Sequence, residues 1–302
     1  MKNDGNNTET ITHLSLCSGY EGIGLGLRRV LPNLREIAYV EREGFPVANL
    51  VAKMEAGDLD AAPVFTDVKT FPYRKFRGLV DILSGGFPCQ PFSNAGKREG
   101  VEDPRHLFPY IRDGIRECRP RLVFLENVEG IISSKTADGE SVLQYVLREL
   151  EGLGYRATAG VFSAAEVGAP HQRKRVFILG YSRSSEPSGV SSEQRKKGSE
   201  ARESSEELAN HSSTRSETWI PTERHWEKGD AKITNNYCLG DWPSRPDERQ
   251  KVFEEPRTVK SKLGRTTNGT ANRVDRLRLL GNGVVPATAA KAFVTLLNRI
   301  TF

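Results

Sequence analysis

The chain has 302 residues, of which 37% are hydrophobic and 27% are charged, and this length suits one large domain with a smaller companion. Its four cysteines, Cys17, Cys89, Cys118 and Cys238, are far apart and form no CxxC pair, which disfavours a disulfide scaffold and a structural metal. Residues 1–12 lack the apolar core of a signal peptide, and no run approaches the roughly 18 consecutive apolar residues of a membrane span. We therefore expect a soluble, cytoplasmic protein without a membrane or metal partner.

The net charge of +5 is unevenly distributed along the chain. Residues 241–302 hold 12 Lys and Arg against 6 Asp and Glu, whereas residues 1–240 hold 32 against 33. A basic segment on an otherwise neutral protein suits contact with phosphate groups. A solvated charged surface would explain the same counts, so charge alone leaves both interpretations open.

Apolar runs predict six strands, at residues 12–17, 36–40, 79–83, 121–125, 155–162 and 175–179. Helical patterns lie between several of them. The clearest consists of Val142, Leu143, Val146, Leu147, Leu150 and Leu153, whose spacing places them on one face. Similar apolar spacing predicts helices near residues 107–118 and 285–300. Strands that alternate with helices predict an α/β fold with a doubly wound, mostly parallel sheet.

The composition changes after Gly180. Residues 181–218 are rich in serine and in charges of both signs and have almost no aliphatic side chains, which is typical of a flexible segment. A little core material returns at residues 219–271, where three tryptophans and several other aromatic residues occur. We therefore predict a small, irregular second domain within residues 181–271.

A glycine-rich turn follows the first predicted strand. Ser18, Gly19 and Tyr20 lead into further glycines at the start of a helix, and such turns allow a ligand to approach the backbone closely. The spacing is not GxGxxG, because position 27 is leucine, and this disfavours a dinucleotide phosphate site. Glu41 ends the next strand about 20 residues further on, where an acidic side chain in such folds accepts hydrogen bonds from ribose hydroxyls.

A cysteine lies on the loop that follows the third predicted strand, in the sequence Gly-Gly-Phe-Pro-Cys-Gln-Pro-Phe-Ser at residues 85–93. Prolines 88 and 91 prevent helix and ladder formation, so the thiol of Cys89 is expected on a stiff, exposed loop. Open α/β sheets bind their ligands at this end of the strands. The alternative is a small buried hydrophobic residue, which is the usual role of a free cysteine.

These segments resemble the motifs of the DNA cytosine-5 methyltransferases of bacterial or phage type. The resemblance is carried by residues 85–93 with their continuation at 97–105, by Glu-Asn-Val at 126–128, and by residues 14–26, 41, 67–68, 171–175 and 281–286. These blocks occur in the order in which the family has them. They cover roughly the first 180 residues and the last 30, and leave the segment between them unmatched.

The resemblance implies the fold of an S-adenosylmethionine-dependent methyltransferase. Residues 1–180 and 272–302 would form a discontinuous catalytic domain, with the last helix packed beside the N-terminal strand. Residues 181–271 would be the target-recognition region, with a flexible start at 181–218. The cofactor would be held by Ser18, Gly19, Tyr20, Glu41, Asp67, Val68, Gly86 and Asn282, with Asp67 and Val68 at the adenine. Cys17, Arg42 and His171 depart from the family pattern, which usually has phenylalanine, a bulky apolar residue and glutamine there.

The resemblance also implies a chemical role for several residues. Cys89 would attack C6 of cytosine, and Glu126 would supply a proton to N3. Arg173 and Arg175, which strand geometry would project to one side, would bind the base at O2. The target base must leave the duplex, and the loop from Cys89 would close over it. The loop residues expected to contact DNA are Gln90, Ser93, Lys97, Arg98 and Arg105.

We therefore predict a monomeric enzyme that methylates cytosine at C5 within a specific sequence of double-stranded DNA. A cognate restriction endonuclease would be a partner if the chain belongs to a restriction–modification pair, which the sequence leaves open. Two alternatives remain at this point. One is methylation of cytosine in RNA by the same fold, and the other is a DNA-binding remnant that has lost turnover.

Overall fold

The computed structural model describes residues 10–88, 107–136, 138–183 and 273–301. Its strands are β1 (Ile11–Leu16), β2 (Leu34–Val40), β3 (Val64–Phe65), β4 (Ile82–Gly86), β5 (Leu122–Val128), β6 (Tyr155–Phe162) and β7 (Arg175–Ser182). Its α-helices are α1 (Gly22–Val30), α2 (Gly44–Glu55), α3 (Phe108–Cys118), α4 (Val142–Gly152), α6 (Arg273–Asn282) and α7 (Pro286–Thr301). Short 3-10 helices are η1 (Tyr73–Phe76), η2 (Glu129–Ile131) and η3 (Ala165–Val167).

The strands form one seven-stranded sheet in the order β3-β2-β1-β4-β5-β7-β6. Strands β1 to β5 are parallel, whereas β7 is antiparallel to both β5 and β6. All six predicted strands are present, and the mostly parallel α/β fold is confirmed. The strand β3 was missed because its two residues are too few to show a pattern. The predicted third strand began too early, since Leu79 is 54% exposed and β4 begins at Ile82.

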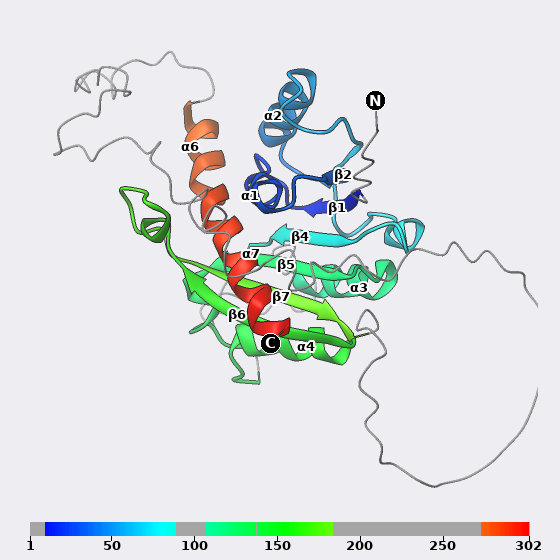
Figure 1. The fold of residues 1–302 in the computed structure, drawn as a ribbon, viewed down its shortest axis with the longest axis vertical. Coiled ribbons are helices and arrows are strands. Elements are labelled where there is room, and N and C mark those ends of the chain that lie inside the picture. Colours follow the sequence, from blue (N-terminus) through cyan, green and yellow to red (C-terminus); the bar gives the residue numbers. More distant parts are fainter. Residues whose placement is uncertain (1–9, 89–106, 137, 184–272, 302) are drawn as a thin grey trace, which may run out of the picture.

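Helices cover both faces of the sheet, which gives three layers (Figure 1). Alternate side chains of β5 show how the layers form. Leu122 and Phe124 lie in the cluster with α1 and α7, whereas Val123 and Leu125 lie in the cluster with α3 and α4. All four are nearly inaccessible to solvent, and full burial of such a side chain stabilises the fold by about 1.5–3 kcal/mol. The strand therefore carries no polar side chain until it reaches Glu126.

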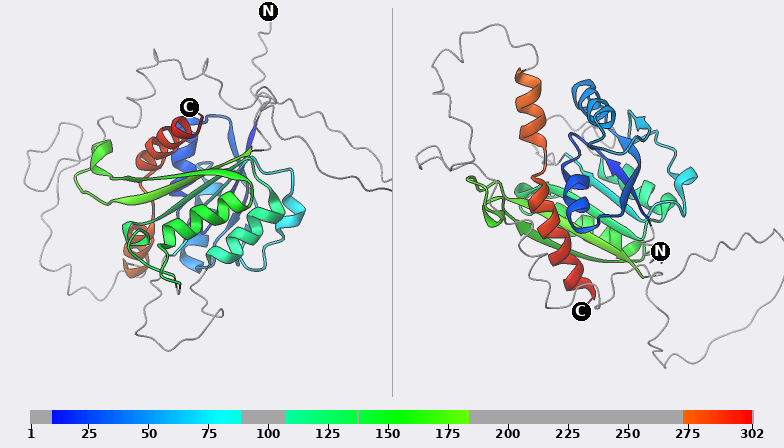
Figure 2. Two further views of the ribbon diagram at one scale, coloured as in Figure 1. Left: turned by 90° about the horizontal axis from the view of Figure 1, so that it is seen from below. Right: turned by 45° about the horizontal axis from the view of Figure 1, so that its top comes forward.

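The helix α7 returns from the far end of the described chain to cover the face of the sheet on the α1 side (Figure 2). It packs against α1, β6 and β7, and Phe293 meets the ring of Phe124 edge-on with centroids 5.4 Å apart. Its apolar stripe was predicted, but α6, which precedes it, was not. Helical residues Arg278–Ile300 are long and apolar enough to cross a membrane by length and composition alone, although much of that stretch is core helix here.

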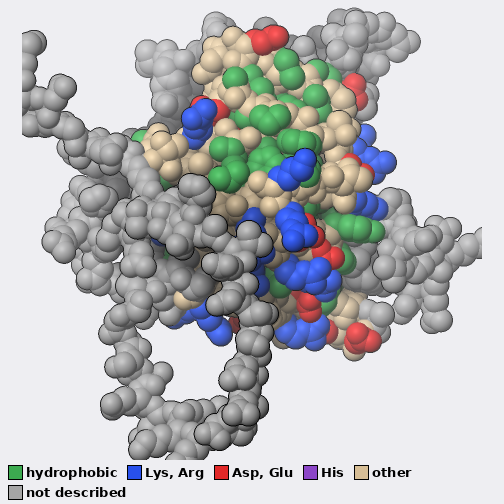
Figure 3. Space-filling model, turned by 90° about the vertical axis from the view of Figure 1, so that its right-hand side faces the viewer, with side chains coloured by type: hydrophobic (Ala, Val, Ile, Leu, Met, Phe, Trp, Pro, Cys, Tyr) green, Lys and Arg blue, Asp and Glu red, His purple; other side chains and the backbone are tan. Residues whose placement is uncertain are grey.

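The helix α2 covers the edge of the sheet at β2 and β3. Leu50 is buried there beside Tyr39 of β2, while Val51 on the outer side of the helix is 40% exposed. Figure 3 shows this side of the molecule, where hydrophobic side chains gather in the upper part and Lys and Arg side chains gather below them. The predicted second domain at 181–271 lies almost wholly outside the described residues, so its boundaries stay a prediction.

Candidate active site

The residues expected at the site meet at one edge of the sheet, where the parallel strands end. Strand β1 lies between β2 and β4, so the chain order reverses at this point, and open α/β sheets bind ligands at such a switch point. The residues that reach this edge are Ser18 to Tyr20 after β1, Glu41 after β2, Asp67 after β3, Gly86 at the end of β4 and Glu126 in β5.

Glu41 is fixed by the backbone on both sides of its carboxylate. The Gly19 amide donates to Glu41 Oε2 and the Glu43 amide donates to Oε1, each at 2.8 Å. Gly19 has φ +55°, a left-handed conformation that favours glycine. Each carboxylate oxygen can accept a further hydrogen bond, so the pair can bind two neighbouring hydroxyl groups. This arrangement fits the ribose of a nucleoside-containing cofactor.

The other expected cofactor residues surround this turn. Ser18 is buried, and its hydroxyl donates to the Ser15 carbonyl at 3.1 Å, so it shapes the turn from within. Val68 is buried, and the half-buried Asp67 accepts from the Lys69 amide at 2.9 Å. One Asp67 carboxylate oxygen is thereby oriented, and the carboxylate keeps the capacity to accept from an amino group.

Two departures from the family pattern have clear surroundings. Cys17 packs against the core at φ +51°, and burial, with a contribution from Glu41, raises the pKa of its thiol to about 12. It is therefore a neutral, hydrophobic side chain at physiological pH. Arg42 is exposed and follows Glu41 directly. The glycines at 22, 24 and 26 lie inside α1 and pack against protein, so only Gly19 belongs to the ligand turn.

Glu126 lies beside the end of the strand that leads to the cysteine loop. It is the cross-strand partner of Gly86, and a β-carbon at Gly86 would lie 3.0 Å from Glu126 Oε2. The next residue, Asn127, donates from Nδ2 to the Phe87 carbonyl at 2.9 Å, and its Oδ1 accepts from the Val128 amide at 2.8 Å. Asn127 thereby ties the end of β5 to the exit of β4, two residues before Cys89.

Burial raises the pKa of Glu126 to about 7, and the nearby Arg175 and Arg173 oppose this shift. Arg175 Nε lies 3.0 Å from Glu126 Oε1 as an ion pair. Arg175 is thus the charged partner of this buried carboxylate oxygen. A carboxyl group with this pKa is protonated in about half of the molecules at neutral pH. The site therefore has a proton available for transfer to a ligand.

The two arginines do not lie on one strand, so the strand-alternation argument for them is wrong. The strand β7 begins at Arg175, and Arg173 precedes it with φ +35°. Arg173 Nη2 donates to the carbonyl of Gly281 at 2.8 Å and to that of Gly283. Both arginines nevertheless lie near Glu126. His171, two residues earlier, is exposed.

The segment after α6 also reaches the site. Asn282 ends α6 and is exposed. The Tyr20 hydroxyl donates to the carbonyl of Val284, and a β-carbon at Gly283 would collide with the Tyr20 ring. The expected cofactor residues Tyr20 and Asn282, far apart in the chain, are therefore brought together.

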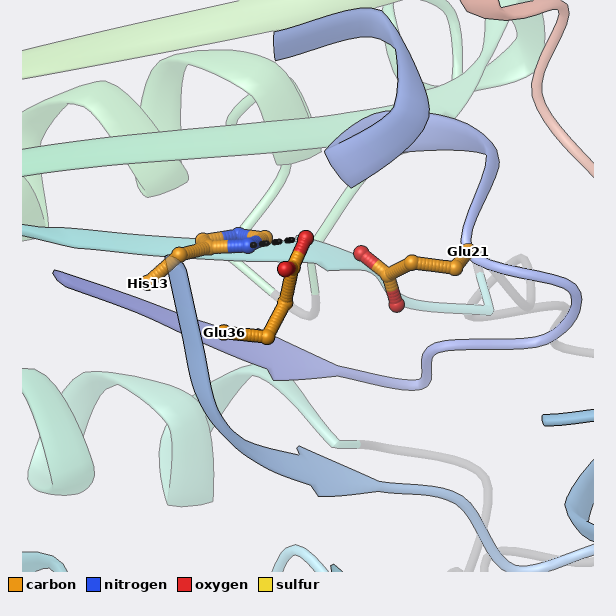
Figure 4. A group of neighbouring side chains, drawn as sticks. All are labelled: His13, Glu21 and Glu36. Carbon is orange, nitrogen blue, oxygen red and sulfur yellow. Dashed lines mark ion pairs between the residues drawn. The ribbon is translucent and has the colours of Figure 1, made fainter. Parts of the chain in front are cut away.

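A buried polar cluster next to the turn was not predicted. Figure 4 shows His13 of β1, Glu36 of β2 and Glu21, with the Glu36 carboxylate between the other two. His13 Nδ1 lies 3.7 Å from Glu36 Oε1, and His13 Nε2 lies 2.8 Å from Ser84 Oγ. Polar residues within apolar strands are the signal that could have indicated this cluster. Their contact depends on the pairing of β1 with β2, which the sequence alone does not provide.

The cluster anchors the start of α1. Glu21 accepts from the Gly24 amide at 3.1 Å and from Ser15 Oγ at 2.7 Å, and it caps the helix. Arg28 pairs with Glu36 and lies 2.5 Å from Asp60. The three side chains have the spacing of metal ligands, but Arg28 already balances the charge of Glu36, and both Glu21 oxygens are engaged. We therefore interpret the cluster as structural.

Six expected site residues lie outside the described residues. They are Cys89, Gln90, Ser93, Lys97, Arg98 and Arg105. The chain leaves the sheet through the buried Phe87 and the exposed Pro88, next to Asn127. The point of departure of the cysteine loop is therefore fixed beside Glu126.

The sheet order and the residues at its carboxyl edge define an α/β protein with a candidate ligand site at the switch point. Residues 11–292 match the family described as C-5 cytosine-specific DNA methylase, and the chain belongs to this family.

Three curated relatives are type II methyltransferases. M.HpaII of Haemophilus parainfluenzae is 37% identical over 169 residues, which cover 55% of this chain and 45% of that protein. M.NgoMIV of Neisseria gonorrhoeae is 33% identical, with 56% and 51% covered. M.PspPI of Psychrobacter sp. is 31% identical, with 55% and 38% covered. The matched region thus spans about half or less of each relative.

Proposed function

We propose that this protein methylates cytosine at C5 in double-stranded DNA, with S-adenosylmethionine as the methyl donor. The observation that carries the proposal is the buried carboxyl group of Glu126. Its pKa of about 7 suits proton transfer at neutral pH, and it lies across from Gly86, three residues before the proposed nucleophile Cys89. Membership of the cytosine-specific family supports cytosine as the base.

The cofactor would be held at the turn after β1. Its ribose would bind Glu41, its adenine would lie at Asp67 and Val68, and its methionine part would lie near Ser18 to Tyr20 and Asn282. When bound, S-adenosylmethionine supplies an electrophilic methyl group. The orientation of the Glu41 carboxylate by two backbone amides supports this assignment, because the acceptors are fixed before a ligand arrives.

The chain's own groups would prepare the base for reaction. C5 of cytosine is a poor nucleophile, and addition of the Cys89 thiolate to C6 makes it electron-rich. Glu126 would donate its proton to N3 as negative charge develops on the ring, and Arg175 would stabilise charge on the same base. Burial raises the pKa of Cys17 and of Cys118 to about 12, so neither forms a thiolate readily. This supports Cys89 as the nucleophile.

Further properties follow from the same assignment. The base would be flipped out of the duplex, with the loop after Cys89 closing over it. Residues 219–271 would read the sequence around the target, and the enzyme would act as a cytoplasmic monomer. The type II names of the relatives support a cognate restriction endonuclease as a partner.

A covalent trap tests the proposal. DNA that carries 5-fluorocytosine at the target should become attached to the protein, in a band that survives denaturing electrophoresis and requires S-adenosylmethionine. After addition and methylation, C5 must lose a substituent as a cation to release the thiol, which hydrogen can do and fluorine cannot. The thioether to Cys89 therefore persists. RNA of the same sequence serves as the alternative acceptor.

Cysteine variants provide the matched controls. Cys89→Ser should abolish the band, because a neutral hydroxyl is a much weaker nucleophile than a thiolate. Cys17→Ser and Cys238→Ser should retain it. Attachment at another cysteine would overturn the mechanism, and attachment of RNA in place of DNA would overturn the substrate.

A further inference from the structure

Three segments that are far apart in the chain meet at the cofactor turn. They are Tyr20 after β1, Arg173 before β7, and residues 281–284 between α6 and α7. Arg173 Nη2 donates to the carbonyls of Gly281 and Gly283, which flank Asn282 on both sides. The Tyr20 hydroxyl donates to the next carbonyl, that of Val284. Every one of these contacts holds the backbone around Asn282.

The contact of Arg173 is favourable for two physical reasons. The last carbonyl groups of a helix lack partners within the helix, and Gly281 is in the last turn of α6. The same end of the helix carries partial negative charge, which a guanidinium group stabilises. The backbone of Arg173 lies at φ +35°, a conformation that is costly for a residue with a side chain. The surrounding contacts must therefore hold the residue in place.

The contact of Tyr20 is equally constrained. Its ring packs so closely on Gly283 that no β-carbon fits there. On the other side, Lys53 donates to the Tyr20 carbonyl at 2.9 Å, and its Nζ lies 5.2 Å from the centre of the ring. Tyr20 is thus fixed from α2 and from the segment after α6. Any shift of residues 281–284 would be transmitted to the turn that contains Ser18 and Gly19.

We propose that Arg173 is a positioning residue for the cofactor site, which fixes the backbone around Asn282 and, through Tyr20, the turn after β1. This inference rests on the proposed function and changes the role that the resemblance gave to Arg173. Arg175 then remains the arginine that would face the base, because its Nε lies 3.0 Å from Glu126 Oε1. The two arginines, two residues apart, then serve different ligands.

The affinity for S-adenosylmethionine, measured without DNA, distinguishes a role of Arg173 in the cofactor site from a role in binding the base. Binding of S-adenosylmethionine by calorimetry should weaken about tenfold or more in Arg173→Gly, because charged hydrogen bonds are lost. Glycine accepts the left-handed backbone without strain, so this variant removes the side chain without adding strain, and the glycine control at position 174 accounts for the added backbone freedom. Arg173→Lys keeps the charge but not the planar fork, and should also weaken binding. Lys174→Gly is the matched control, because Lys174 is exposed and its Nζ lies 3.8 Å from Glu129.

The second half of the contact can be tested with Tyr20→Phe, which removes only the hydroxyl donor. In the double variant, the fold loss of cofactor affinity should be smaller than the product of the losses in the two single variants, because both substitutions act on residues 281–284. The inference would be overturned if Arg173→Gly bound the cofactor with an affinity within twofold of the parent's but bound target DNA more weakly. Failure of the parent protein itself to bind S-adenosylmethionine would instead overturn the proposed function.

Discussion

Glu126 shows how the surroundings of a side chain set its protonation. Burial at the end of β5 raises its pKa to about 7, although two arginines nearby oppose the shift. The raised pKa means that the protonated form persists up to about pH 7 and is lost above it. A group that must donate a proton is therefore active on the acidic side of this value.

Replacement of this carboxyl group gives the first prediction at the residue scale. Glu126→Gln should reduce kcat by about 10²- to 10⁴-fold, because an amide keeps the shape but cannot transfer a proton. In the parent enzyme, kcat/KM should fall as the pH rises through about 7, and this fall should be absent in the variant. Steady-state kinetics between pH 5.5 and about 9 would measure both effects.

The control for this prediction is cofactor binding. Affinity for S-adenosylmethionine should be almost unchanged in Glu126→Gln, because Glu41 and Asp67 are the acidic groups proposed to hold the cofactor. A large loss of cofactor affinity with normal turnover would assign Glu126 to the other ligand.

The positions of several candidate residues were predictable from sequence because they depend on local motifs. Glu41 and Glu126 reach the edge of the sheet as expected, because Glu41 follows β2 and Glu126 follows the apolar part of β5, and the apolar pattern revealed both strands. The contact between His13 and Glu36 was not predictable, because it depends on which residues pair across β1 and β2. The left-handed conformation of Arg173 was also hidden, since arginine rarely adopts it and no local signal marks it.

At the scale of elements, the contact between α1 and α7 depends on glycine. A β-carbon at Gly26 would lie 2.5 Å from the Pro286 carbonyl oxygen and 2.7 Å from the β-carbon of Ala289. The two helices can approach this closely only without a side chain there. The N-terminal end of α7 is thereby held at α1, close to residues 281–284.

Gly26→Ala should therefore lower the free energy of unfolding by about 1–3 kcal/mol, because the added methyl group forces α7 away from α1. Gly152→Ala is the matched control at the end of α4, where a β-carbon meets nothing within 4 Å. Alanine there should be neutral or stabilising by up to about 1 kcal/mol. Urea denaturation of both variants would measure the difference. Equal stability of the two would show that the helices can separate without cost.

Elements with strong periodicity were predicted and those without it were not. The helices α3, α4 and α7 each place an apolar stripe on the sheet, and this stripe is visible in the sequence. The apolar residues of α6 are interspersed with arginines, and its Leu280 is 65% exposed, so no apolar stripe indicated this helix. The antiparallel direction of β7 could not be inferred either, because buried strands look alike in both directions.

At the scale of the whole molecule, base chemistry and sequence recognition should be separable. In the proposed function, the groups at the edge of the sheet would face a single flipped base, and none of them would report which bases lie beside it. Recognition of the neighbouring bases is expected from residues 219–271, where each base-edge contact contributes about 1–3 kcal/mol of discrimination.

Transplanting residues 219–271 into a related enzyme should therefore transfer the recognised sequence, with the rate of catalysis set by the host. Bisulfite sequencing of DNA from cells that express the chimera would identify the methylated sites. The reciprocal chimera, with the region of the relative in this chain, provides the control. A chimera that keeps the site of its host would show that recognition lies elsewhere.

The position of α7 has a consequence for the biosynthesis of the protein. The side chains of Phe124, Phe177 and Leu179 are covered on one face by Phe293 and Leu296, which the ribosome makes after residues 184–272. Translation proceeds at about 5–20 residues per second, so this apolar face stays open for several seconds on each nascent chain. During that interval the sheet is a target for chaperones and for aggregation. Because the contacts of Arg173 and Tyr20 also require residues 281–284, the proposed cofactor site would be complete only when this late helix docks.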